Sequence, residues 1–174
     1  SINKTCLASV EGVRSRPNVD MHLWNSGANG HDLFATEIDL ALFVVFRMDF
    51  VLSGYDGNST LADFPVLVEL HEGLSNFSYA TFLSATGADL RFFASTGQEL
   101  AYEIENWDVA DISRVWVKVP EVSGADTTIT AAWGNALAAN SPGYANDGSV
   151  WTNGYSGTWH FATMLSDSLL DSTS

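Results

Sequence analysis

Short runs of β-branched and aromatic residues, separated by turn signals, recur along the chain from Phe46 onward. The clearest run is "VWVKV", in which three valines alternate with Trp116 and Lys118. A period of two residues places alternate side chains on opposite faces of a strand. Several short strands of this kind, bounded by Gly, Asn, Asp and Ser, are typical of an antiparallel sandwich or barrel. The sequence therefore predicts an all-β fold.

The predicted architecture is an antiparallel β-sandwich, jelly-roll-like, with one short helix at residues 76–83. The predicted strands cover residues 47–52, 64–70, 89–93, 99–107, 115–119 and 127–133. Between two of them, "STGQ" predicts a three-residue hairpin loop with Gly97 in the left-handed region, which glycine adopts without steric cost.

The chain divides into three segments by pattern. Residues 1–45 show no sustained period of 2 or 3.6 residues, so we expect a poorly defined N-terminal segment. Residues 46–136 contain all the predicted strands and form the expected sandwich domain. Residues 137–174 are rich in Gly, Asn and Ser, with Trp151 and Trp159 among them.

The charge of the chain narrows its range of partners. Seven Lys and Arg residues stand against 21 Asp and Glu residues, which gives a formal net charge of −14. An acidic surface repels phosphate backbones and anionic lipid headgroups, so nucleic acid is an unfavourable partner. Neutral glycans, calcium ions and basic protein patches remain compatible with it.

The sequence carries few signs of disulfide, zinc or membrane structure. Cys6 is the single cysteine, and no Cys/His zinc spacing occurs. The apolar run "LALFVVF" is too short to span a bilayer, which takes about 20 residues. It is not a signal peptide either, because Glu37 and Asp39 precede it where positive charge belongs. A targeting segment upstream of Ser1 is compatible with this sequence.

The hairpin around Gly97 sorts the flanking residues onto two faces. The apolar face, expected in the core, holds Leu90, Phe92, Leu100, Tyr102 and Ile104. The opposite face holds Asp89, Arg91, Glu99, Glu103 and Glu105. The favoured interpretation of this second face is a hydrated row of carboxylates balanced by Arg91.

A catalytic interpretation of Glu103 and Glu105 stays open. Two residues apart on one strand, their backbones are separated by roughly 6.6 Å, close to the spacing of a glycosidase carboxylate pair. A general acid also needs a pKa raised by burial or by a close like charge. An exposed row beside Arg91 would instead keep both carboxylates ionised.

Trp116 is predicted to share the outward face of its strand with Lys118. An outward indole bordered by Lys, Thr and Glu gives a flat apolar platform with hydrogen-bonding groups around it, which suits a sugar ring. The alternative is that another layer or a neighbouring domain covers this tryptophan.

Metal and cofactor signals are weak. Asp56 and Asn58 in "YDGNST" could donate oxygens to calcium, but a turn is the favoured use of these residues. "HEG" is not HExxH, "GYSGT" is not GxSxG, and no phosphate-binding loop occurs. The sequence predicts no cofactor.

Several blocks, taken in order, resemble a known family: "FRMDFVLSGYDGNSTLADFPVLVEL", "GADLRFFASTGQELAYEIENWD", "VWVKVP", "TITAAWGN" and "TWHF". They resemble the bacterial domain-of-unknown-function family numbered 2341, over about Phe46 to His160. The resemblance implies a β-sandwich module of large secreted or surface-attached bacterial proteins, often followed by a concanavalin A-like, laminin-G-type domain. "TWHFATMLSDSLLDSTS" looks like the opening of such a domain. The family has no established enzymatic residues to carry over.

We therefore expect a non-catalytic binding or adhesion module, extracellular or on the cell surface, with a glycan as the expected ligand. Neighbouring domains of the same polypeptide are the other expected partners. The candidate binding residues are Trp116, Lys118, Glu103, Glu105, Arg91 and Trp107.

Two alternatives remain. The first is a structural spacer between domains. The second is a glycoside hydrolase or lyase using Glu103 and Glu105, although "EIENWD" departs from the ExDxxE strand motif of some concanavalin-like hydrolases.

Overall fold

The computed structural model describes residues 8–9, 45–52, 55, 57–123, 127–160 and 171–173. Most of the predicted N-terminal segment, residues 1–45, lies outside the described residues, as does the calcium candidate Asp56. Most of the expected opening of a following domain also lies outside them.

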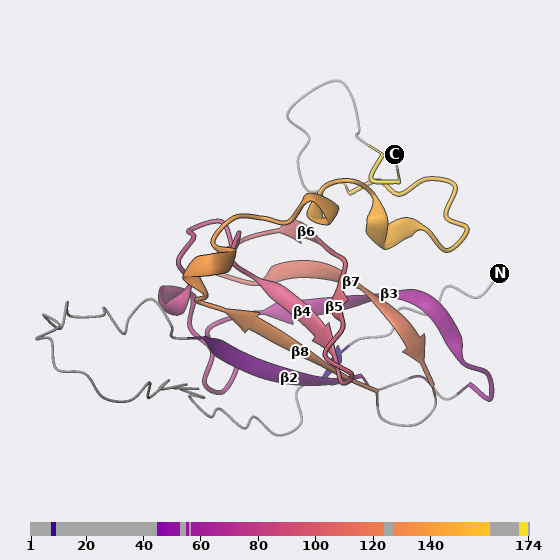
Figure 1. Cartoon of the computed structure of the whole chain (residues 1–174), viewed down its shortest axis with the longest axis horizontal. Coiled ribbons are helices and arrows are strands. Elements are labelled where there is room, and N and C mark those ends of the chain that lie inside the picture. The colour runs from indigo at the N-terminus through magenta and orange to yellow at the C-terminus, as the bar shows by residue number, and fades with distance from the viewer. Residues whose placement is uncertain are drawn as a thin grey trace, which may run out of the picture.

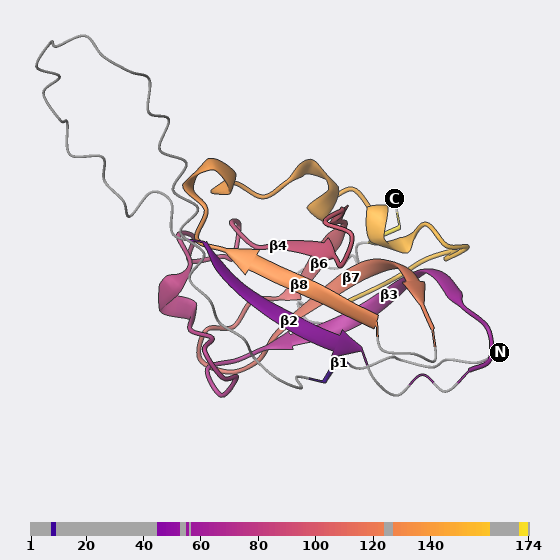
Figure 2. The same cartoon turned by 60° about the horizontal axis from the view of Figure 1, so that its bottom comes forward.

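Two antiparallel sheets face each other (Figures 1 and 2), so the predicted all-β sandwich is confirmed. One sheet has the strand order β1-β2-β8-β4-β5 and the other β3-β7-β6. The strands are β1 Ala8–Ser9, β2 Phe46–Leu52, β3 Leu61–Leu70, β4 Arg91–Ala94, β5 Glu99–Leu100, β6 Tyr102–Asn106, β7 Ser113–Val122 and β8 Thr127–Trp133. The helical elements of the described chain are short 3-10 turns: η2 Tyr79–Thr81, η3 Ala136–Ala138, η4 Gly143–Ala145 and η5 Ser149–Trp151. The helix predicted at residues 76–83 is thus the single turn η2.

The chain changes sheets repeatedly, so that β2 pairs with β8 and β3 with β7, a nested arrangement of the jelly-roll kind. The predicted strand 99–107 is divided by such a change at Ala101. Leu100 belongs to one sheet and Tyr102 to the other, while the Ala101 carbonyl accepts the Lys118 N–H at 2.9 Å. The alternation of buried and outward side chains continues across Ala101, because Leu100 and Tyr102 both face the core between the two sheets.

The core follows the predicted alternation. The side chains of Leu90, Phe92, Leu100 and Tyr102 are buried, and the four valines of β7 are buried with them. The predicted hairpin loop is also confirmed, because Gly97 has φ of 85° and the Ala94 N–H donates to the Gln98 carbonyl.

Asp89 departs from the predicted polar face. Asp89 is only 1% exposed, whereas the sequence analysis predicted that it belongs to a hydrated row of charged side chains. The carboxylate accepts backbone N–H groups from Leu83 and Ser84 at 3.0 Å and from Gly134 at 2.9 Å. Three donors replace the lost water, so burial of this charge is tolerated.

After β8 the chain returns across the β3-β7-β6 sheet, above β6 in Figure 1. We call residues 143–160 and 171–173 the C-terminal strap. Its turn η4 contacts β6 and its turn η5 contacts β7, and Ala145, Val150 and Trp151 are buried. Among the described residues, no helix is long and apolar enough to cross a membrane.

Candidate functional site

Glu103 and Glu105 lie on the outward face of β6, but they do not form the predicted hydrated row. Their side chains are only 17% and 22% exposed. The C-terminal strap covers them, which the local alternation of β6 could not reveal. Arg91 is not beside them, so the predicted balance between Arg91 and Glu103 is wrong.

The Glu103 carboxylate is engaged on both oxygens. Oε2 accepts the indole N–H of Trp151 at 2.6 Å, and Oε1 accepts the hydroxyl of Ser172 at 2.7 Å. Nε2 of His160 lies 3.2 Å from Oε1. Burial raises the pKa of Glu103, but His160, Ser172 and Trp151 together outweigh it, and the pKa falls below its ordinary value.

His160 lies between the two carboxylates. Its Nδ1 is 3.5 Å from Oε2 of Glu105 while its Nε2 faces Glu103. The contact with Glu103 raises the pKa of His160, burial lowers it, and the charges of both glutamates raise it further, so the net shift is upward. The sequence offered no ligand spacing for this histidine, and its only signal was the block "TWHF".

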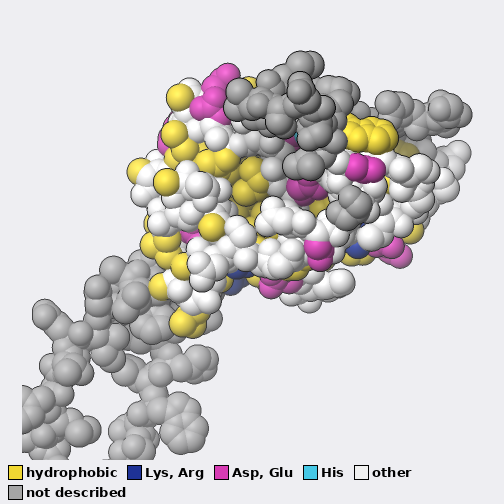
Figure 3. Space-filling model, turned by 90° about the horizontal axis from the view of Figure 1, so that it is seen from above, with side chains coloured by type: hydrophobic (Ala, Val, Ile, Leu, Met, Phe, Trp, Pro, Cys, Tyr) yellow, Lys and Arg dark blue, Asp and Glu magenta, His cyan; other side chains and the backbone are white. Residues whose placement is uncertain are grey.

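Trp116 faces outward from the sandwich, as the alternation predicted. It is nevertheless not a free platform. Its indole N–H donates to Oε2 of Glu105 at 2.6 Å, and its ring centroid lies 5.3 Å from that of Trp151. The exposed aromatic side chains of the strap are Tyr155 and Trp159, at 40% and 49%. Figure 3 views the molecule from the side of the strap and shows hydrophobic and acidic side chains on this face.

The structure brings Trp116 together with Glu103 and Glu105, and Lys118 follows on the same face. The ammonium of Lys118 donates to the Thr152 hydroxyl at 3.2 Å. Trp107 lies elsewhere, edge-on to Tyr79, and its buried indole N–H has no acceptor among the described residues.

Arg91 is a structural anchor. Its guanidinium donates to four backbone carbonyls, those of Ala88, Leu90, Ala138 and Asn140. Its Nε lies 3.6 Å from a Glu99 oxygen, which agrees with the predicted cross-strand pairing of these two residues. Arg91 therefore fixes the start of the segment that leads to the strap.

No metal centre emerges from the described residues. None of their His, Cys, Asp and Glu side chains form a group of three or more that could hold a metal ion. Asn58 of the predicted calcium pair lies in an exposed bend.

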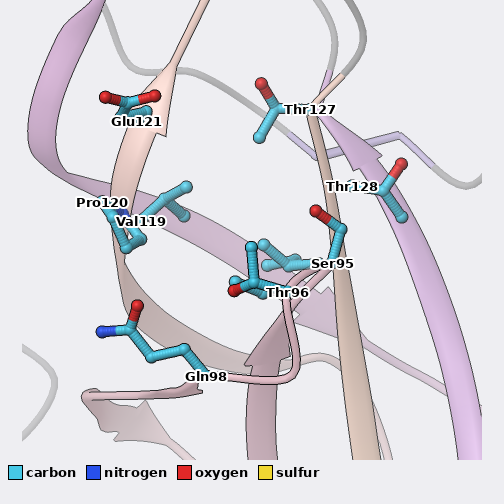
Figure 4. A pocket seen from close by; sticks show the side chains of 10 residues that line it. Ser95, Thr96, Gln98, Val119, Pro120, Glu121, Thr127 and Thr128 are labelled. Carbon is cyan, nitrogen blue, oxygen red and sulfur yellow. The ribbon is translucent and has the colours of Figure 1, made fainter.

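A groove opens at one end of the sandwich, between the end of β7 and the start of β8 (Figure 4). Its volume is about 420 Å³, and Ala94, Val119, Pro120 and Ile129 supply its apolar lining. Its polar lining residues are Ser95, Thr96, Gln98, Glu121, Thr127 and Thr128. Within the described part of the chain, no hydrogen bond or ion pair engages these six polar side chains.

A second cavity of about 340 Å³ adjoins the first, because Gln98 and Pro120 line both. Its charged lining residues are Asp63, Glu99 and Lys118. Tyr144 of the strap also lines it and donates its hydroxyl to Glu99. We call the two cavities together the end groove.

The backbone is irregular beside the end groove. Pro120 has no N–H, and the β3–β7 register passes over the pair that Asp63 and Pro120 would form. Asp63 has φ of 46°, a left-handed conformation that is uncommon for a residue with a side chain. Sequence reasoning missed this groove because its polar residues come from three separate turns and strand ends.

Comparison with known proteins finds a family model that matches part of the chain. Residues 86–158 match the family model described as "Domain of unknown function (DUF2341)", which confirms the predicted resemblance over those residues. The match runs from the loop before β4 through β8 and into the strap. No curated protein and no solved structure matches the chain.

Proposed function

We propose that this domain is a non-catalytic binding module of a secreted or surface-attached bacterial protein, and that its end groove binds a neutral glycan. The family resemblance supports the location. The observation that carries the binding site is the set of unengaged polar side chains around an apolar floor.

The chemistry of the end groove favours sugar hydroxyls. Ser and Thr hydroxyls and the Gln98 amide each both donate and accept hydrogen bonds, as sugar hydroxyls do. The Pro120 ring and the Tyr144 ring offer apolar surface for the faces of sugar rings.

The charges that line the end groove also favour a neutral ligand. Three carboxylates, from Glu121, Asp63 and Glu99, and one ammonium, from Lys118, line the end groove. An anionic ligand such as a phosphate would meet net repulsion there. Two adjoining cavities suit a chain of at least two sugar units rather than a single ring.

The engagement of the β6 carboxylates supports a non-catalytic role. A glycosidase needs one protonated carboxyl and one free carboxylate facing substrate. Glu103 accepts two hydrogen bonds, has a lowered pKa and is covered by the strap. The Glu105 carboxylate likewise accepts a hydrogen bond from the indole N–H of Trp116.

A structural role is the second candidate function. Trp151 and His160 of the strap pack on the outward face of β6 and β7. This face is therefore occupied by a later segment of the same chain. A spacer that fixes the direction of the following segment would use such contacts.

Isothermal titration of the chain with a panel of neutral oligosaccharides of two to six units tests the proposed function. We expect at least one member to bind, and Thr127→Val and Gln98→Ala each to weaken it about five- to tenfold through a lost hydrogen bond. Thr60→Val, at an exposed position outside the groove lining, is the control and should bind normally.

Binding that survives both groove substitutions, or no binding by any member, would overturn the site. The same panel is assayed for released reducing ends. Turnover that disappears in Glu103→Gln would overturn the non-catalytic assignment.

A further inference from the structure

The cluster of Glu103, Glu105 and His160 does not line the end groove. Its histidine contacts both carboxylates. The cluster joins β6 to a residue of the strap far along the sequence, and the two imidazole nitrogens lie 3.2 and 3.5 Å from different carboxylates, as close charge contacts rather than aligned hydrogen bonds. The histidine side chain is 16% exposed, so water screens these contacts only partly.

The two-sided contact requires a particular protonation state. A neutral imidazole carries one proton and presents a lone pair on its other nitrogen. With carboxylates on both sides, one glutamate would then face that lone pair. The doubly protonated ring carries a positive charge that attracts both carboxylates, so the two short distances favour the imidazolium form by charge, without an aligned hydrogen bond at Nε2.

We propose that Glu103, His160 and Glu105 form a proton-controlled latch that holds the C-terminal strap on the outward face of β6 and β7. The latch is closed while the imidazole carries both protons and is weakened when one is lost. Trp151, whose ring centroid lies 5.7 Å from that of His160, is held by the same carboxylate and moves with the strap.

The other ionisable groups around the latch are carboxylates, a lysine, an arginine and a tyrosine, types whose ordinary pKa values lie outside the range from about 6 to 9. Hydrogen bonds lower the pKa of Asp147 and Asp171, and burial raises the pKa of Tyr155. On β7, Lys118 is bonded to Thr152, and Arg114 is paired with Glu69 at 3.2 Å. A change in the strap between pH 6 and 9 would therefore report His160.

The pH range follows from the direction of the shifts. The pKa of His160 is raised above 6.5, so the latch is complete below that pH and weakens as pH rises through the higher folded value. The pKa of Glu103 is lowered from 4.5, so its charge persists into mildly acidic solution. The latch is therefore closed in mildly acidic solution and opens in alkaline solution.

Nuclear magnetic resonance of the full chain, without any ligand, tests the latch. The indole N–H signals of Trp116 and Trp151 are assigned by Trp→Phe substitution and followed from pH 5.5 to 9. We expect both to shift with one midpoint above 6.5, together with the His160 ring signals. Backbone amide protection factors in residues 149–160 should fall at least tenfold across that midpoint.

Two variants sharpen the test. Glu105→Gln keeps an acceptor for the Trp116 indole but removes a charge, so the His160 midpoint should fall. His160→Gln should abolish the transition in the indole signals. His71→Gln is the control, because His71 accepts the Gly73 N–H away from the strap and should leave the transition unchanged.

The latch would be overturned by strap protection factors that stay constant while His160 titrates, or by a His160 midpoint at or below 6.5. Because no ligand takes part, failure of the glycan-binding proposal leaves this result interpretable.

Discussion

The indole N–H of Trp151 donates to Oε2 of Glu103 across 2.6 Å, although the two residues are 48 positions apart in sequence. This bond connects η5 of the strap to β6. The carboxylate is mostly buried, so the indole replaces water that the strap excludes. A donor to a buried charge contributes more than an average hydrogen bond.

Trp151→Phe should therefore lower the free energy of unfolding by about 2–3 kcal/mol, because it removes both the donor and part of a buried ring. Urea denaturation followed by circular dichroism measures the change. The exposed Trp159 is the matched control, and Trp159→Phe should cost less than about 1 kcal/mol. Equal effects of the two substitutions would mean that the Glu103 bond is not formed in solution.

The sandwich itself was predictable because strand alternation is a local property. Val115, Val117 and Val119 identify the core side of β7 without any knowledge of its neighbours. The same locality explains the missed break at Ala101. Leu100 and Tyr102 keep their alternation although the chain changes sheets between them.

The covering of β6 was not predictable for the same reason. The strap shows no apolar period that would predict packing, and its bonds to Glu103 and Glu105 join residues far apart in the chain. Asp89 illustrates a related limit: alternation placed it on the polar face, but it precedes β4 and its backbone is not part of the strand. Only tertiary structure supplies its three N–H donors.

Asp89→Asn should destabilise the fold by about 2–3 kcal/mol. The amide keeps the shape of the side chain, but its NH₂ group must face at least one of the backbone donors that the carboxylate satisfied. Thermal and urea unfolding give the difference.

Asp49→Asn is the control for Asp89→Asn. Asp49 is exposed and accepts one hydrogen bond, from Thr130 at 2.6 Å, so its loss should cost less than about 1 kcal/mol. An Asp89→Asn protein as stable as the control would contradict the role assigned to this buried carboxylate.

Gly97→Ala isolates the conformational requirement of the β4–β5 hairpin. A Cβ at this position would meet nothing within 4 Å, so the cost comes from φ of 85° alone and should be about 1 kcal/mol. Gly143→Ala is the matched control, since its Cβ would also meet nothing and its φ is not positive. It should leave stability unchanged within about 0.5 kcal/mol. Similar losses at both glycines would mean that the positive φ of Gly97 is not what makes alanine costly there.

The free energy of unfolding should depend on pH through the protonation of His160. A histidine whose folded pKa is raised stabilises the fold fully below its unfolded value of 6.5, and this contribution is lost as pH rises through the folded value. The wild-type chain should therefore lose stability between pH 6.5 and 9 relative to His160→Gln, whose curve lacks this term.

Urea midpoints of the wild type, His160→Gln and His71→Gln at half-unit steps from pH 5.5 to 9 measure the difference. The other titrating groups are shared, so they cancel when the curves are subtracted. His71→Gln should follow the wild type, because His71 is not near a carboxylate of the latch. Parallel curves for the wild type and His160→Gln would show that the imidazole does not couple its charge to folding. A difference that grows as pH falls toward 6.5 would show that the imidazolium, rather than the neutral ring, stabilises the covered face of β6.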